Sequence, residues 1–213
     1  LLLKIADTER KCEEIALEAV CGGQRATIAG SEGKIGFSPV KGSARASWGA
    51  DGIRVEGDFN VNRGELAKLM AAITREFSST GTLTANGTFA LQGATLDTLF
   101  AEPKVEATFN IEQGVLNNVD LVRAIQSPSR DGLRGGTTRF NTLTGSLQLS
   151  GKTYSYRQLQ LASGPMQANG NVDVAPGGEL SGRVSAELGS KTFTVARGTL
   201  NVTGSIKSPT LKP

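Results

Sequence analysis

The chain has 213 residues, a net charge of +3, 38% hydrophobic residues and 27 glycines. It contains no histidine and only two cysteines, which excludes histidine-based acid–base catalysis and a zinc site built from cysteines alone. The 23 basic residues are spread along the chain rather than clustered with aromatics, so we expect no nucleic-acid binding. We also expect no bound metal and no cofactor.

The first 62 residues predict a β-meander. Strand-like stretches at 25–28, 34–37, 44–48 and 52–60 are separated by glycines, as expected for hairpins joined by tight turns. We expect residues 1–62 to be the end of an upstream, repeating β-region, because the chain begins without methionine or a signal peptide. Cys12 and Cys21 are either two free thiols or one disulfide, and a disulfide requires Cα atoms within about 7 Å.

Residues 64–77 break the β pattern and predict an amphipathic helix. Their apolar side chains recur at helical spacing and form one stripe: Leu66, Leu69, Met70, Ile73 and Phe77. This stripe either packs against the sheet or acts as a gate over an open apolar groove.

A shorter helix is predicted near 119–126. Asp120 is a suitable N-cap, and Pro128 follows the last apolar residue of the segment. Residues 127–138 are rich in glycine, proline and arginine, which predicts an exposed loop.

From Val105 onward the chain alternates apolar and polar residues, which places apolar side chains on one face of a sheet. The predicted fold is mainly β, a large curled antiparallel sheet (a trough or an open β-sandwich) with one or two short amphipathic helices. Residues 63–213 form one β-domain in this interpretation. Eight side chains are the candidates for the functional part of this apolar face: Phe109, Ile111, Leu147, Leu149, Leu159, Leu161, Val172 and Val174.

No catalytic motif is recognisable. The chain has no serine–histidine pair, no P-loop and no glycine-rich dinucleotide fingerprint. We therefore expect a protein that is not an enzyme.

An ordered set of motifs over residues 66–213 resembles the C-terminal region of the AsmA-like family of bacterial envelope proteins (AsmA/TamB-related). The set comprises a helix and strand pair at 69–91, the pattern I-x-x-G-V-L-x-N-x-D-L from Ile111 to Leu121, T-T-R-F-x-x-L-x-G at 137–145, A-N-G-N-V-D at 168–173 and G-S-I-x-x-P at 204–209. The first 60 residues resemble the family only in their general β-strand character.

The resemblance implies a periplasmic module of a Gram-negative bacterium, anchored to the inner membrane by an upstream segment. Such a module would shelter or conduct phospholipid acyl chains between the inner and outer membranes. The eight apolar candidates would then face lipid, and exposed strand edges would pair with envelope proteins. The alternative is a closed β-sandwich, a structural or assembly component of an envelope or secretion machine without lipid cargo.

Overall fold

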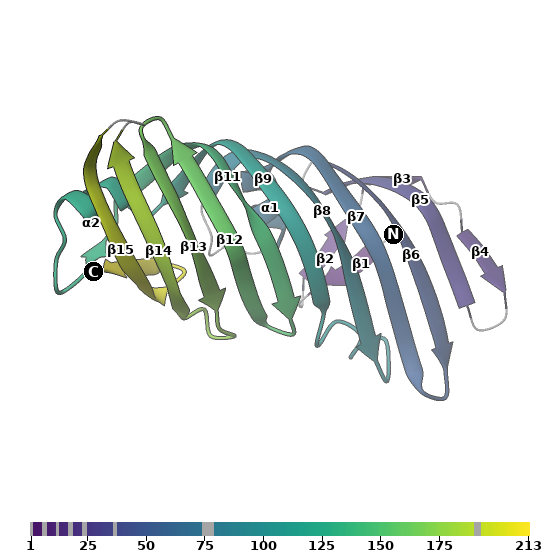
Figure 1. The fold of residues 1–213 in the computed structure, drawn as a ribbon. Coiled ribbons are helices and arrows are strands. Elements are labelled where there is room, and N and C mark those ends of the chain that lie inside the picture. The colour runs from purple at the N-terminus through teal and green to yellow at the C-terminus, as the bar shows by residue number, and fades with distance from the viewer. Residues whose placement is uncertain are drawn as a thin grey trace.

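The computed structural model describes residues 2–5, 8–11, 13–16, 19–22, 25–35, 38–73, 79–189 and 193–213. Within them, 14 strands form one antiparallel sheet that does not close on itself, and two short helices lie beside it (Figure 1). The predicted fold class, a large curled antiparallel sheet with one or two short helices, is confirmed.

Most strands pair with their neighbours in the chain. The elements are β1 (Leu2–Ile5), β2 (Thr8–Lys11), β3 (Glu13–Ala16), β4 (Ala19–Gly22), β5 (Arg25–Ile35), β6 (Ser38–Gly49), β7 (Gly52–Glu65), α1 (Leu66–Ile73), β8 (Ser79–Gly93), β9 (Lys104–Asn117), α2 (Leu121–Gln126), β10 (Leu133–Arg134), β11 (Thr137–Ser150), β12 (Thr153–Ser163), β13 (Met166–Val174), β14 (Leu180–Gly189), β15 (Thr194–Ser205) and β16 (Ser208–Lys212). The sheet order is β10-β16-β15-β14-β13-β12-β11-β9-β8-β7-β6-β5-β3, with β4 also paired to β5, while β1 and β2 form a separate pair.

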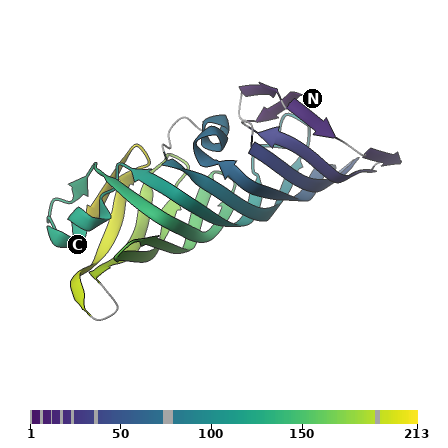
Figure 2. The ribbon, with the colours of Figure 1, turned by 90° about the horizontal axis from the view of Figure 1, so that it is seen from above.

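The sheet has two long rims, at opposite ends of its strands. One rim carries α1, between β7 and β8, and α2, between β9 and β11; we call it the helix rim. The other carries the short connections at 50–51, 94–103, 151–152 and 175–179, and we call it the hairpin rim. Figure 2 shows the sheet from above as a long band, with the two chain ends far apart.

Helix α1 begins at Leu66, two residues after the start of the predicted span of 64–77. Gly64 and Glu65 belong to β7, because they pair with Leu83 and Thr82 of β8. Strand pairing therefore prevails over helical periodicity at these two positions. Residues 74–77 lie outside the described residues.

The predicted helix near 119–126 is confirmed as α2. Asp120 caps it, because its carboxylate accepts a hydrogen bond from the Arg123 backbone N–H at 2.9 Å. The hydroxyl of buried Thr138 donates to the Val119 carbonyl at 2.7 Å and accepts from the Leu121 N–H at 3.1 Å. These bonds attach the start of α2 to β11.

The prediction of an exposed loop at 127–138 is only partly right. Leu133 and Arg134 form β10, which pairs with Leu211 and Thr210 of β16. The Arg134 guanidinium also donates to the Thr210 hydroxyl at 2.9 Å. This segment thus returns to the last strand and adds an outermost strand to the sheet.

Two other predictions concern the N-terminal third. The division between residues 62 and 63 falls inside β7, which pairs with both β6 and β8, and it stays a prediction. Cys21 lies in β4, whereas Cys12 lies outside the described residues, so the disulfide also stays a prediction.

Candidate functional site

One face of the sheet, the apolar face, is a set of parallel rows of side chains that cross from strand to strand. One row on the side of the hairpin rim, which we call the hairpin row, follows the register from β6 to β14. Its members are Ala44, Gly57, Phe89, Val105, Leu149, Tyr154, Val174 and Leu180.

Two middle rows and a row near the helix rim lie beside the hairpin row on the apolar face. The first middle row is Gly42, Phe59, Gly87, Ala107, Leu147, Tyr156, Val172, Gly182, Val202 and Leu211. The second is Val40, Val61, Ala85, Phe109, Gly145, Leu159, Gly170, Val184 and Leu200. The helix row is Leu83, Ile111, Leu143, Leu161, Ala168 and Ala186. None of these side chains carries a charge.

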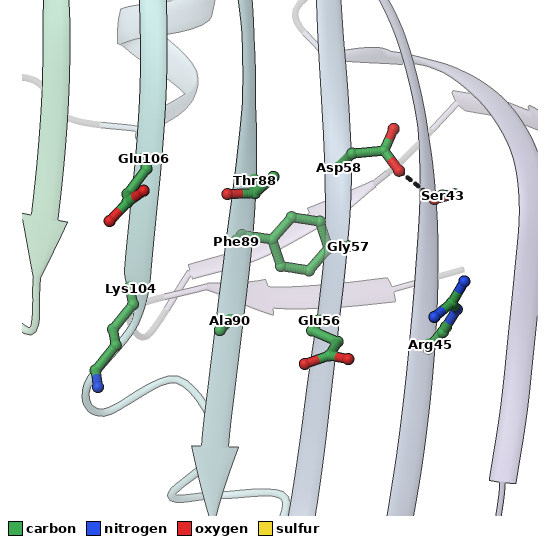
Figure 3. Close-up of a pocket in the computed structure, with 10 residues that line it drawn as sticks. All are labelled: Ser43, Arg45, Glu56, Gly57, Asp58, Thr88, Phe89, Ala90, Lys104 and Glu106. Carbon is green, nitrogen blue, oxygen red and sulfur yellow. Dashed lines mark hydrogen bonds between the residues drawn. The ribbon is translucent and has the colours of Figure 1, made fainter.

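Phenylalanine rings of the apolar face lie over glycines of neighbouring strands. A β-carbon on Gly57 would come within 2.8 Å of the Phe89 ring, and one on Gly145 within 3.0 Å of the Phe109 ring. Figure 3 shows the Phe89 ring extending from β8 toward Gly57 of β7. Glycine thus leaves room for each ring against the backbone, an arrangement suited to a curved sheet.

Burial changes from one rim to the other. In the helix row, Ile111, Leu161, Ala168 and Ala186 are buried, and they belong to a cluster that includes residues of α2. In the hairpin row every member except Val174 is only half-buried. The apolar face is therefore packed at the helix rim and accessible at the hairpin rim.

The C-terminal end of the apolar face is also packed. Leu200 is 2% exposed, and Val202 and Leu211 of the first middle row are buried with it. Helix α2 reaches this end closely, since a β-carbon on Gly198 of β15 would lie 3.3 Å from the Ile125 side chain. Trp48 of β6, toward the other end of the sheet, is 41% exposed. The accessible part of the face therefore runs along the hairpin rim and away from the C-terminal end.

The structure brings all eight predicted apolar candidates to this face. Phe109, Leu147, Leu149, Leu159 and Val172 are half-buried, while Ile111, Leu161 and Val174 are buried. Only the first group is thus accessible to a ligand.

The predicted stripe of α1 is described in part. Leu66 and Leu69 are buried and pack in the two hydrophobic clusters of the sheet. The side chains of Met70 and Ile73, and all of Phe77, lie outside the described residues. Leu66 and Leu69 therefore have a packing position, and a gating role stays a prediction.

Sequence reasoning missed two members of the apolar face, Tyr154 and Tyr156. Strict alternation on β12 would place them opposite Leu159 and Leu161, on the polar face. The register shifts between Tyr156 and Leu159, and Gln158 has a φ of 52°. This β-bulge places Tyr154 and Tyr156 on the same face of the sheet as Leu159 and Leu161. No feature of the sequence marks the bulge, because glutamine rarely adopts a positive φ.

Tyr156 of the first middle row contacts Phe109 of the second middle row. Its ring meets the Phe109 ring edge-on, with centroids 6.4 Å apart and planes at 79°. Burial raises the pKa of Tyr156 to about 12, and the neighbouring Tyr154 contributes to the rise. The phenol therefore stays protonated and able to donate a hydrogen bond at physiological pH.

The opposite face of the sheet is polar. A hollow of about 500 Å³ lies across β6 to β9 on this face, and its polar lining residues are Ser43, Arg45, Glu56, Asp58, Thr88, Lys104 and Glu106 (Figure 3). The Ser43 hydroxyl donates to Asp58, and the charged residues of the lining are all exposed. The mixed charges and the exposure describe a hydrated surface.

An ion pair stands further along the polar face. The Arg157 guanidinium donates to the Asp173 carboxylate at 2.6 Å, and the Ser155 hydroxyl donates to the same oxygen at 2.6 Å. These hydrogen bonds, from Arg157 first and Ser155 second, lower the pKa of Asp173. Polar cross-strand pairs of this kind stabilise the polar face of the sheet while it is exposed to water.

Within the described part of the chain, no cluster of acidic or cysteine side chains has the composition of a metal site. The helices of that part are too short to cross a membrane. A comparison with protein-family models, curated proteins and solved structures found no match to this chain.

Proposed function

We propose that this chain shelters the acyl chains of phospholipid, or of another membrane lipid, on its apolar face. The observation that carries the proposal is the half-buried, uncharged hairpin row, continued by Leu147 and Val172 in the next row. Each methylene transferred from water to such a surface gains about 0.8 kcal/mol. The polar outer face would keep the loaded protein in water.

The size of the sheet suits this role. With a strand spacing of about 4.8 Å, the 13 strands in the main order span about 60 Å. The first middle row crosses ten of these strands, from β6 to β16, and no side chain in it carries a charge. A surface of this size accommodates several acyl chains side by side.

The setting we propose is the envelope of a Gram-negative bacterium. The motifs that resemble the AsmA-like family support a periplasmic module, held at the inner membrane by an upstream segment, that conducts lipid between the inner and outer membranes. The outermost strands, β10 at one end and β3 and β4 at the other, offer backbone groups with which an envelope protein can pair.

The first experiment asks whether lipid occupies the apolar face. The chain is expressed with a photocrosslinking residue at Phe109 or Val172, purified, and analysed by native mass spectrometry and lipid extraction. Matched positions on the polar face are Thr108 and Asn171, each adjacent in sequence and exposed. We expect co-purified phospholipid and crosslinks from Phe109 and Val172 only.

A pair of substitutions separates lipid binding from folding. Leu149→Asp places a charge in the half-buried hairpin row, and Gln148→Asp places it on the exposed polar face one residue away. We expect both variants to keep their circular dichroism spectrum and only Leu149→Asp to lose lipid. Absence of phospholipid from the unsubstituted protein, together with absence of crosslinks, would overturn the proposal and favour a structural component without cargo.

A further inference from the structure

Both tyrosines of the chain lie side by side on the apolar face of β12. Tyr154 pairs with Leu149 and Val174, and Tyr156 pairs with Leu147 and Val172. All other members of the four rows are glycine or hydrocarbon side chains. The two phenols are therefore the only hydrogen-bonding side chains in these rows.

Neither phenol forms a hydrogen bond with another described residue. Tyr156 is half-buried against Phe109, in surroundings that raise its pKa. A tyrosine hydroxyl among apolar side chains ordinarily has a hydrogen-bond partner, either in the protein or in ordered water. Since the rest of these rows is glycine or hydrocarbon, a partner for these hydroxyls has to come from a ligand or from water.

The position of the two tyrosines restricts the kind of ligand. Tyr154 is the second residue of β12, close to the turn at 151–152, and Tyr156 lies one row deeper. A lipid whose chain ends point to the packed helix rim has its polar end at the hairpin rim, beside these phenols. The rows carry no positive charge to neutralise a phosphate or carboxylate. An uncharged acceptor, such as an ester carbonyl, satisfies a phenol without that charge.

We infer that the hydroxyls of Tyr154 and Tyr156 donate hydrogen bonds to the ester carbonyl oxygens of a glycerolipid. This inference rests on the proposed function. It names the ligand class as diacyl lipids linked through esters, and it orients them with the chain ends toward the helix rim.

The test compares two lipids that differ only in the linkage. The probes are dipalmitoyl phosphatidylethanolamine and its dihexadecyl ether analogue, which lacks the carbonyl oxygens. Delipidated protein is loaded with an equimolar mixture, and native mass spectrometry measures the ratio of the two complexes. We expect the ester lipid to be favoured about threefold to tenfold, the size of one net hydrogen bond.

The double variant Tyr154→Phe, Tyr156→Phe keeps both rings and removes both hydroxyls, so we expect it to bind the two lipids equally. Ser155→Ala is the matched control, since it removes a hydroxyl from the polar face between the two tyrosines and should keep the ester preference.

Equal binding of the two lipids by the unsubstituted protein, or an ester preference that persists in the double variant, would overturn this inference and leave the proposed function intact. Water is then the partner of the phenols. Failure to bind either lipid would overturn the proposed function and this inference together.

Discussion

The helix row and the hairpin row contain the same kinds of side chain but differ in what lies over them. Four of the six helix-row side chains are buried in a cluster that includes α2. All members of the hairpin row except Val174 remain half-buried, on the same strands and the same face. The contrast arises within single strands, a few residues apart, as on β9 between buried Ile111 and half-buried Val105.

This difference separates two uses of hydrophobic side chains. At the helix rim and the C-terminal end, apolar contacts hold the sheet in its curved shape. At the hairpin rim, the same chemistry is available to a ligand. Changes at the first region should therefore lower stability, and changes at the second should mainly affect binding.

The largest expected contrast comes from one substitution made in both regions. Leu200→Ala, at a fully buried position of the second middle row, should lower the free energy of unfolding by about 3–4 kcal/mol, because it leaves a cavity. Leu149→Ala, in the half-buried hairpin row, should cost about 1 kcal/mol. Urea unfolding followed by circular dichroism measures both. Equal losses would mean that the hairpin row is as tightly packed as the core.

A second contrast uses the glycines under the phenylalanine rings. A β-carbon on Gly114 would collide with the buried Phe140 ring and with the Thr80 carbonyl oxygen. We expect Gly114→Ala to cost about 2–3 kcal/mol, as overpacking does in a rigid site.

Gly145→Ala is the matched change nearer the accessible region. Its β-carbon would meet the ends of the Leu159 and Phe109 side chains at 2.8 and 3.0 Å, and these can move. We expect a loss below about 1 kcal/mol in the same unfolding assay. A larger loss at Gly145 than at Gly114 would contradict the assignment of the packed region.

The third prediction concerns the alkaline stability of the accessible region. Because the pKa of Tyr156 is raised to about 12 in the folded protein, the unfolded chain ionises first as the pH rises above 10. Stability contributed by the neutral phenol should be present below pH 10 and lost between pH 10 and 12, by on the order of 2 kcal/mol. Tyr156→Phe should remove this part of the pH dependence. Unfolding curves from pH 8 to 12 test it, and an unchanged dependence in the variant would refute the assignment to Tyr156.

The smallest effect is expected at the cap of α2. Asp120→Ala removes the acceptor of the Arg123 N–H and should cost about 1 kcal/mol, whereas Asp120→Asn should be nearly neutral because asparagine also caps helices. If α2 covers the helix rim as described, hydrogen exchange of β14 and β15 amides should accelerate in the alanine variant and hardly change in the asparagine variant. If the two variants gave the same exchange rates, the cap at Asp120 would not contribute to the packing of α2 on these strands.

Several features follow from local sequence. The alternation of apolar and polar residues from Val105 to Ile111 predicts a strand with one apolar and one polar face, and the structure has both. The cap at Asp120 and the short helix after it depend only on neighbouring residues, and both were predicted. The start of α1 was predicted two residues too early, since Gly64 and Glu65 pair with a strand that begins at Ser79, outside their local window.

The amino-acid sequence by itself determined that this protein has an antiparallel sheet with one apolar face, because successive side chains of a strand point to opposite faces and the apolar residues recur at every second position. Only the tertiary structure decided which part of that face is covered. The return of β10 to β16, the packing of Ile125 over Gly198 and the bulge at Gln158 join residues that are distant in the chain or shift their phase. No local pattern encodes these events, and they leave the hairpin row, with Tyr154, accessible.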